Sequence, residues 1–114
     1  MKDDILHILW VNDNPVTAEN MVFMYATNAL LKKWWSEVHV IIWGATTKLI
    51  CENQSLQEKL RLFIEAGGSV SACKRCAENL GVLEAITGIP GIDVLYIGEN
   101  FTAILKSEER VISI

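Results

Sequence analysis

The strongest chemical pattern in this sequence is a pair of cysteines, Cys73 and Cys76, separated by Lys74 and Arg75. Cys73 follows a short strand-like run and precedes a helical pattern, so we expect its sulfur to lie near the N-cap, beside free backbone N–H groups and the positive end of the helix dipole. Lys74 and Arg75 add positive charge nearby. These effects favour the thiolate, so the sequence predicts a lowered pKa for Cys73.

The position of Cys76, about one helical turn after Cys73, brings two sulfurs together at a helix start, as in dithiol redox sites. The alternative is that both are small buried side chains without chemistry, since free cysteine is often buried. The polar pair between them favours a turn close to solvent and therefore a reactive site.

A metal site is a weaker interpretation of the same motif. A structural zinc needs four ligands, there is no second C-x-x-C, and His7 and His39 fall in the middle of predicted strands. We therefore predict no metal and interpret both histidines as hydrogen-bonded core residues. No glycine-rich nucleotide motif is present, so no cofactor is predicted, and no Ser-His-Asp or paired-carboxylate arrangement can be singled out.

Two further residues are weaker candidates. Lys48 is a possible contact for an anionic substrate, against the alternative of an ordinary solvated lysine. Cys51 is interpreted as a packed small hydrophobe.

The composition restricts the classes of function. The chain has 114 residues, 51% of them hydrophobic and 21% charged, with a net charge of −4. We predict a single domain over residues 1–114 and no nucleic-acid binding, because no basic stripe is present. No run is apolar and long enough for a membrane helix, and the first residues do not resemble a signal peptide. With three cysteines, an odd number, we expect a cytoplasmic protein in a reducing compartment.

The elements that must position the cysteines alternate between strand and helix. Strands are predicted at residues 5–11, 38–43, 69–72, 93–97 and 110–114, the last at a sheet edge, and helices at residues 16–35, 56–66, 74–80, 82–86 and 100–106. This order is typical of an α/β fold with a parallel sheet between helical layers. Ligands of such sheets lie beyond the carboxyl ends of the strands, so the site segments are 12–15, 44–48, 73–76 and 98–100.

The predicted first helix carries apolar residues on two sides. Besides the face that suits the sheet, a second patch is formed by Met21, Met24, Leu31 and Trp35. Since a surface helix needs only one apolar face, this patch predicts a homo-oligomer, against the alternative of a helix covered within the monomer.

Segments 38–50, 56–82 and 91–105 resemble the DsrE/DsrF-like family of small sulfur-relay proteins. The most specific part is Ala72-Cys73-x-x-Cys76-Ala77 followed by Leu80-Gly81-Val82. The resemblance implies a five-stranded parallel sheet, assembly into trimers or hexamers, and a cysteine after the third strand that carries sulfur as a persulfide. That position is Cys73, eight residues before Gly81. Some members have only this cysteine, and Cys76 is a departure from them.

The resulting hypothesis is a sulfurtransferase-type persulfide carrier with sulfur-donor and sulfur-acceptor proteins as partners. In it, Cys73 holds the sulfur, Cys76 releases it, and Lys74 and Arg75 stabilise the anion. Two alternatives remain: a dithiol redox protein, and a non-catalytic oligomeric module that binds a small anion or a protein.

Overall fold

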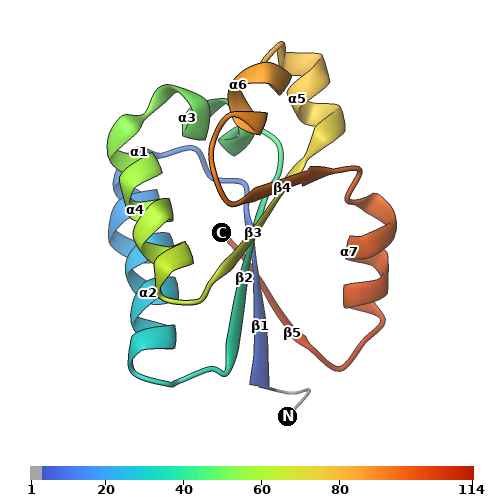
Figure 1. Cartoon of the computed structure of the whole chain (residues 1–114). Helices are drawn as coiled ribbons and strands as arrows, with labels where there is room; N and C mark the ends of the chain where they lie inside the picture. The colour runs from blue at the N-terminus through green and yellow to red at the C-terminus, as the bar shows by residue number, and fades with distance from the viewer. Residues whose placement is uncertain (1–3) are drawn as a thin grey trace.

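One parallel sheet of five strands forms the centre of the molecule. The structure is a computed structural model and describes residues 4–114. The strands are β1 (Ile5–Trp10), β2 (Glu37–Ile42), β3 (Ser69–Cys73), β4 (Ile92–Leu95) and β5 (Arg110–Ser113). Their order is β4-β3-β2-β1-β5, and every neighbouring pair is parallel. The predicted α/β class, the parallel sheet and the edge position of the last strand are confirmed (Figure 1).

Helices connect successive strands. They are α1 (Pro15–Thr17), the π-helical η2 (Ala18–Phe23), α2 (Met24–Leu31), α3 (Thr46–Glu52), α4 (Gln54–Glu65), α5 (Lys74–Leu80), α6 (Leu83–Thr87) and α7 (Gly98–Leu105). The segments α1, η2 and α2 follow one another directly, so the predicted first long helix exists but ends at Leu31 rather than residue 35. Lys33 has a φ of 59°, which α-helical geometry does not allow.

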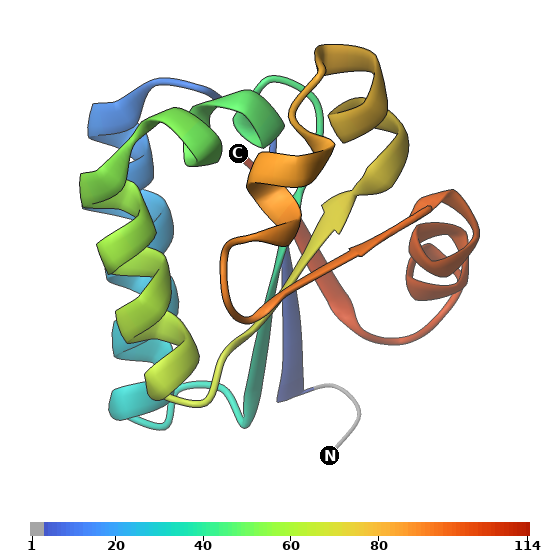
Figure 2. The same cartoon turned by 45° about the horizontal axis from the view of Figure 1, so that its top comes forward.

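Helical layers cover both faces of the sheet (Figures 1 and 2). The face with η2, α2 and α4 holds the larger core, in which Trp10, Phe23 and Phe63 pack edge-to-face. On the opposite face, α7 packs on a smaller cluster centred on Ile41, Cys73 and Ile97. The predicted three-layer architecture is therefore confirmed, and Cys73 belongs to the α7 side.

Two sequence predictions around α3 and α4 are wrong. Residues 46–52 form α3, where no helix was expected; its start is held by the Thr46 hydroxyl, which donates to the backbone oxygen of Trp10 at 2.7 Å. The helix predicted at residues 56–66 begins earlier, as α4, and its N-cap is Asn53: the Asn53 side chain accepts from the N–H of Leu56 at 3.0 Å. Asparagine is among the preferred N-cap residues, because its side-chain oxygen accepts from a free N–H group of the first turn.

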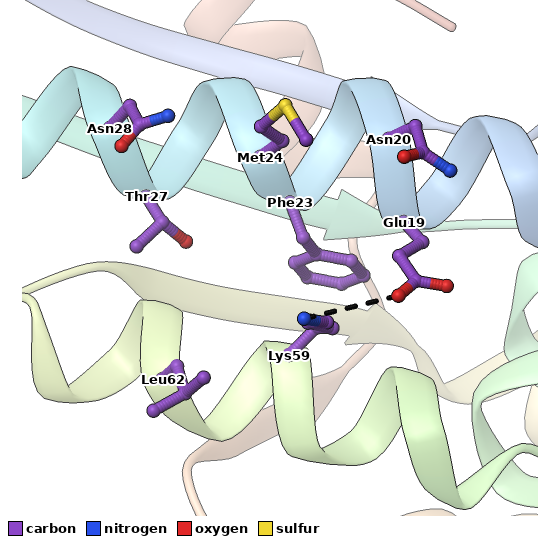
Figure 3. Close-up of a pocket in the computed structure, with 8 residues that line it drawn as sticks. All are labelled: Glu19, Asn20, Phe23, Met24, Thr27, Asn28, Lys59 and Leu62. Atoms are coloured by element: carbon purple, nitrogen blue, oxygen red, sulfur yellow. Dashed lines mark ion pairs between the residues drawn. The ribbon is translucent and has the colours of Figure 1, made fainter.

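The predicted second patch on the first long helix is exposed, with one correction. Met21, Met24 and Leu31 are 40%, 52% and 64% exposed. Trp35 is half-buried and donates its indole N–H to the Tyr25 hydroxyl at 3.0 Å, whereas Trp34 is exposed beside the patch. Between this helix and α4 lies a surface hollow of about 240 Å³, in which Glu19 and Lys59 form an ion pair and whose lining includes Phe23 and Leu62 (Figure 3). Within residues 4–114, no helix is long and apolar enough to span a bilayer.

Candidate functional site

Cys73 lies where β3 ends and α5 begins. Its backbone is extended, with φ −70° and ψ 111°, and its side chain caps α5: the N–H of Cys76 donates to the Cys73 Sγ over 3.3 Å. The predicted N-cap position is confirmed. β3 stops here because its pairing with β4 ends at Cys73 and Leu95, at the carboxyl edge of the sheet.

The surroundings of the Cys73 sulfur are apolar. The residue is 5% exposed and packs with Ile41 and Ile97 on the α7 side of the sheet. Burial, followed by the side-chain hydrogen bond with Cys76, raises the pKa of Cys73; the N–H groups of Cys76 and Arg75 act in the opposite direction but do not compensate. The predicted lowering of this pKa is wrong, because desolvation of a thiolate outweighs the N-cap contacts.

Cys76 lies next to Cys73 but is more open to solvent. It is half-buried, in the same cluster on the α7 side, and both thiols are free. The two sulfur-bearing residues are therefore neighbours, as the spacing predicted. Cys73 is the sheltered sulfur and Cys76 is the one closer to solvent.

The two cations between the cysteines are held by other partners. The Lys74 ammonium lies 5.2 Å and the Arg75 guanidinium 5.7 Å from the centre of the Tyr96 ring. Arg75 also pairs with Glu78 at 3.4 Å, and the Tyr96 hydroxyl donates to Glu78 at 2.9 Å. Both cations therefore lie on α5 against Tyr96 and Glu78. The lowering of the Cys73 pKa that we expected from their charge is absent.

Lys48 and Cys51 both lie on α3. The Lys48 side chain is exposed. Cys51 packs against the core on the α4 side of the sheet, and its thiol donates to the backbone oxygen of Thr47 at 3.3 Å. Burial and then Glu52 raise its pKa. The interpretation of Cys51 as a packed small hydrophobe is confirmed, and it does not join the other two cysteines.

The structure adds a polar chain that sequence reasoning missed. Four side chains form a row on the α7 side of the sheet, one from the residue before β5 and one each from β1, β2 and β3. We call them the Ser71 chain: Glu109, His7, His39 and Ser71. The distances are 2.6 Å from Glu109 to His7 Nε2, 2.8 Å between the two histidine Nδ1 atoms, and 2.7 Å from His39 Nε2 to Ser71 Oγ. Both histidines are hydrogen-bonded, as expected, but they are linked to a serine and a carboxylate.

A partial signal for the Ser71 chain exists in the sequence. Side chains two residues apart on a strand share a face, so Ser71 lies on the same face as Cys73. His7 lies opposite His39 only because of the register between β1 and β2, which the sequence does not show. Glu109 lies outside any strand, so no strand pattern could place it. Among residues 4–114, no group of three or more His, Cys, Asp or Glu side chains is arranged to hold a metal ion.

Comparison with solved structures finds proteins that share this fold. The chain is similar to a conserved protein of unknown function, BT1422, from Bacteroides thetaiotaomicron: the two are 40% identical, the match covers 97% of this chain and 95% of that one, and the TM-score is 0.93. It is also similar to YchN of E. coli, which has a DsrE/TusD-like fold, at 13% identity over the whole of both chains with a TM-score of 0.68. That second likeness shows the fold alone. No protein-family model and no curated protein sequence matches the chain.

Proposed function

The chain belongs to the same family as the Bacteroides protein BT1422, and from the geometry around Cys73 we propose that it is a persulfide carrier of a sulfur relay. The observation that carries the proposal is the position of the Cys73 sulfur. It lies at the carboxyl edge of the sheet, caps α5 and accepts a hydrogen bond from the Cys76 N–H at 3.3 Å. The resemblance to the DsrE/DsrF-like family and the fold shared with YchN support the same proposal.

Loading is a nucleophilic substitution at sulfur. The Cys73 thiolate attacks the outer sulfur of a donor persulfide, R–S–SH; the new S–S bond gives Cys73–S–SH, and the old S–S bond breaks to release R–S⁻, which takes up a proton. Because Cys73 is 5% exposed, the loaded sulfur is sheltered from other thiols. The amide N–H groups at the start of α5 stabilise the charge on sulfur.

Release uses the second cysteine. The Cys76 thiolate attacks the inner sulfur of Cys73–S–SH, forming the Cys73–Cys76 disulfide and expelling the outer sulfur as sulfide. The two cysteine sulfurs are oxidised and the transferred sulfur is reduced, so electrons balance. An external dithiol then restores both thiols. Cys76 suits this role because it is the neighbouring thiol and the more exposed one.

The dithiol redox alternative is favoured by the same contact between Cys73 and Cys76. It differs in what the protein carries: electrons only, with no sulfur gained. The two functions therefore give different masses after treatment with a persulfide.

The test is intact mass after incubation of the reduced protein with glutathione persulfide. The carrier gains one sulfur that dithiothreitol removes; Cys73→Ser abolishes the gain, and Cys51→Ser, the matched control, leaves it unchanged. Cys76→Ser increases the fraction that stays loaded, because expulsion needs the second thiol. Equal loading of Cys73→Ser and the native protein would overturn the proposal. A native protein and Cys76→Ser that never gain sulfur would favour the redox alternative.

We propose further that the protein is a homo-oligomer that uses the face of Met21, Met24 and Leu31. These three apolar side chains are exposed on one helix face, and Met21 and Met24 line a surface hollow together with the exposed Trp34. Exposed apolar surface of this kind marks association surfaces. Donor and acceptor proteins of the relay would then approach the Cys73 edge of the sheet.

A further inference from the structure

The donors and acceptors of the Ser71 chain follow from the carboxylate at its end. Glu109 accepts, so His7 Nε2 carries a proton and donates at 2.6 Å. With His7 neutral, its Nδ1 accepts from His39 Nδ1, which leaves His39 Nε2 as an acceptor for the Ser71 hydroxyl at 2.7 Å. Each member has a partner, and the direction of donation runs from Ser71 to Glu109.

This direction is the one that activates a serine. A nucleophilic hydroxyl needs a base within hydrogen-bond reach, and the base needs a third group that fixes its tautomer and stabilises the cation that forms. Here His39 is the base, and His7 with Glu109 takes the place of the third group.

Ser71 and His39 face a cavity of about 200 Å³ under α7. Its polar lining consists of Ser71, His39, Asp93 and Asn100, and α7 contributes the apolar Phe101 and Ile104. The chain of hydrogen bonds therefore ends in a space that a small molecule can enter.

We propose that Ser71 is an activated nucleophile and that this cavity is a second site, for acyl transfer from small neutral carboxylic esters. The proposal goes beyond the sulfur relay and does not rest on Cys73. The Ser71 Oγ attacks the ester carbonyl carbon and forms an acyl–serine; the carbon–oxygen bond to the alcohol breaks. The alcohol leaves with the proton taken from Ser71, and water then hydrolyses the acyl–serine to a carboxylic acid.

The proton has a path away from His39. Burial and the neighbouring His7 lower the pKa of His39 to about 4, so it is a weak base by itself. When Ser71 gives its proton to His39 Nε2, His39 can pass its Nδ1 proton to His7 Nδ1 over 2.8 Å. The cation then rests on His7, against the Glu109 carboxylate at 2.6 Å. His39 acts on the reacting atoms, and His7 and Glu109 are positioning residues.

The lining also selects the substrate class. Asp93 places a carboxylate in the cavity, which repels anionic acyl donors such as acyl phosphates. Asn100 makes no side-chain hydrogen bond with the described residues, so its amide N–H₂ is free to donate to the oxyanion of the tetrahedral intermediate. The volume limits the acyl group to a short one.

Diisopropyl fluorophosphate tests the nucleophile directly. Ser71 Oγ displaces fluoride from phosphorus, and the adduct is read by intact mass and mapped by peptide mass spectrometry. We expect one adduct, on Ser71. Ser71→Ala should lose it, and Ser69→Ala, two residues earlier on the same face of β3 and outside the chain, should label like the native protein. No adduct on Ser71, or an adduct elsewhere only, overturns the proposal.

Glu109→Gln tests the chain without removing the nucleophile. The glutamine oxygen still accepts from His7, so the hydrogen bond survives, but the cation on His7 loses its counter-charge. We expect labelling of Ser71 at least about tenfold slower. The charged groups facing His39 are His7, Glu109 and Asp93, and α7 adds uncharged side chains. Acid should therefore suppress labelling at a lower pH in Glu109→Gln than in the native protein. An unchanged rate and pH profile contradicts the role of the chain.

The substrate class is tested by acylation of the native protein with p-nitrophenyl acetate and acetyl phosphate. Acetylation mapped to Ser71 from the neutral ester, and not from the phosphate, is expected. Equal acetylation by both contradicts the selection by Asp93. Circular dichroism of each variant confirms that it is folded.

Discussion

The backbone N–H of Cys76 donates to the Sγ of Cys73 over 3.3 Å, so the first turn of α5 closes around this sulfur. Only 5% of the Cys73 surface is exposed to solvent. A helix start usually activates a cysteine. Here the same turn buries it, and the resting thiol is protonated. The reactivity of this site is therefore governed by desolvation, and its pH dependence should show this.

The first prediction concerns alkylation of Cys73. Because burial raises its pKa, the thiolate fraction near pH 7 is lower than in the unfolded chain, and the rate with iodoacetamide should rise at a higher pH than in urea. Cys76→Ala should move the midpoint down, because the Cys76 side chain contributes to the rise. Peptide mass spectrometry at a series of pH values measures this. A midpoint below that of the unfolded protein would contradict the prediction.

The second prediction is that Cys73 and Cys76 oxidise together. Both side chains belong to one apolar cluster at the start of α5, and the Cys76 N–H lies 3.3 Å from the Cys73 sulfur, so we expect the two sulfurs to reach disulfide geometry. Diamide should remove two hydrogens from the monomer mass, and Cys51→Ser should behave in the same way. Cys76→Ser should not form an intramolecular bond. Incorporation of Cys51 into the first disulfide would show that the pairing is wrong, since Cys51 packs on the other side of the sheet.

The third prediction concerns acid stability. The pKa of His39 falls from 6.5 in the unfolded chain to about 4 in the folded protein. A depressed pKa stabilises the fold above pH 6.5, and this stability is lost as the pH falls toward 4. The full loss is roughly 3 kcal/mol. Urea unfolding at a series of pH values should show a steeper fall for the native protein than for His39→Gln. Parallel curves for the two proteins would refute it.

The fourth prediction concerns the oligomer. Light scattering should report a species larger than 12.8 kDa, and Leu31→Asp should dissociate it, because a charge in a buried apolar contact is costly. Leu105→Asp, on the exposed side of α7, is the matched control and should leave the assembly intact. A stable monomer contradicts the oligomer. Dissociation by Leu105→Asp alone would assign the interface to the opposite face.

The sequence by itself determined the architecture and the place of the cysteines. Runs of aliphatic residues separated by helical patterns predict parallel strands, because buried strands need apolar side chains on both faces. The predicted helices 56–66 and 74–80 end within one residue of α4 and α5, which end at Glu65 and Leu80. These signals are local, and they put Cys73 at the N-cap, where the structure has it.

Only the tertiary structure decided the environment of each site. The raised pKa of Cys73 comes first from its burial, and it packs with Ile41 of β2 and Ile97 at the start of α7, which are distant from it in the sequence. The Ser71 chain joins residues 7, 39, 71 and 109, which meet only because β1, β2 and β3 lie side by side and Glu109 directly precedes β5 beside β1. Spacing along a chain fixes which side chains share an element; which elements lie beside each other, and how much water they exclude, is set by packing.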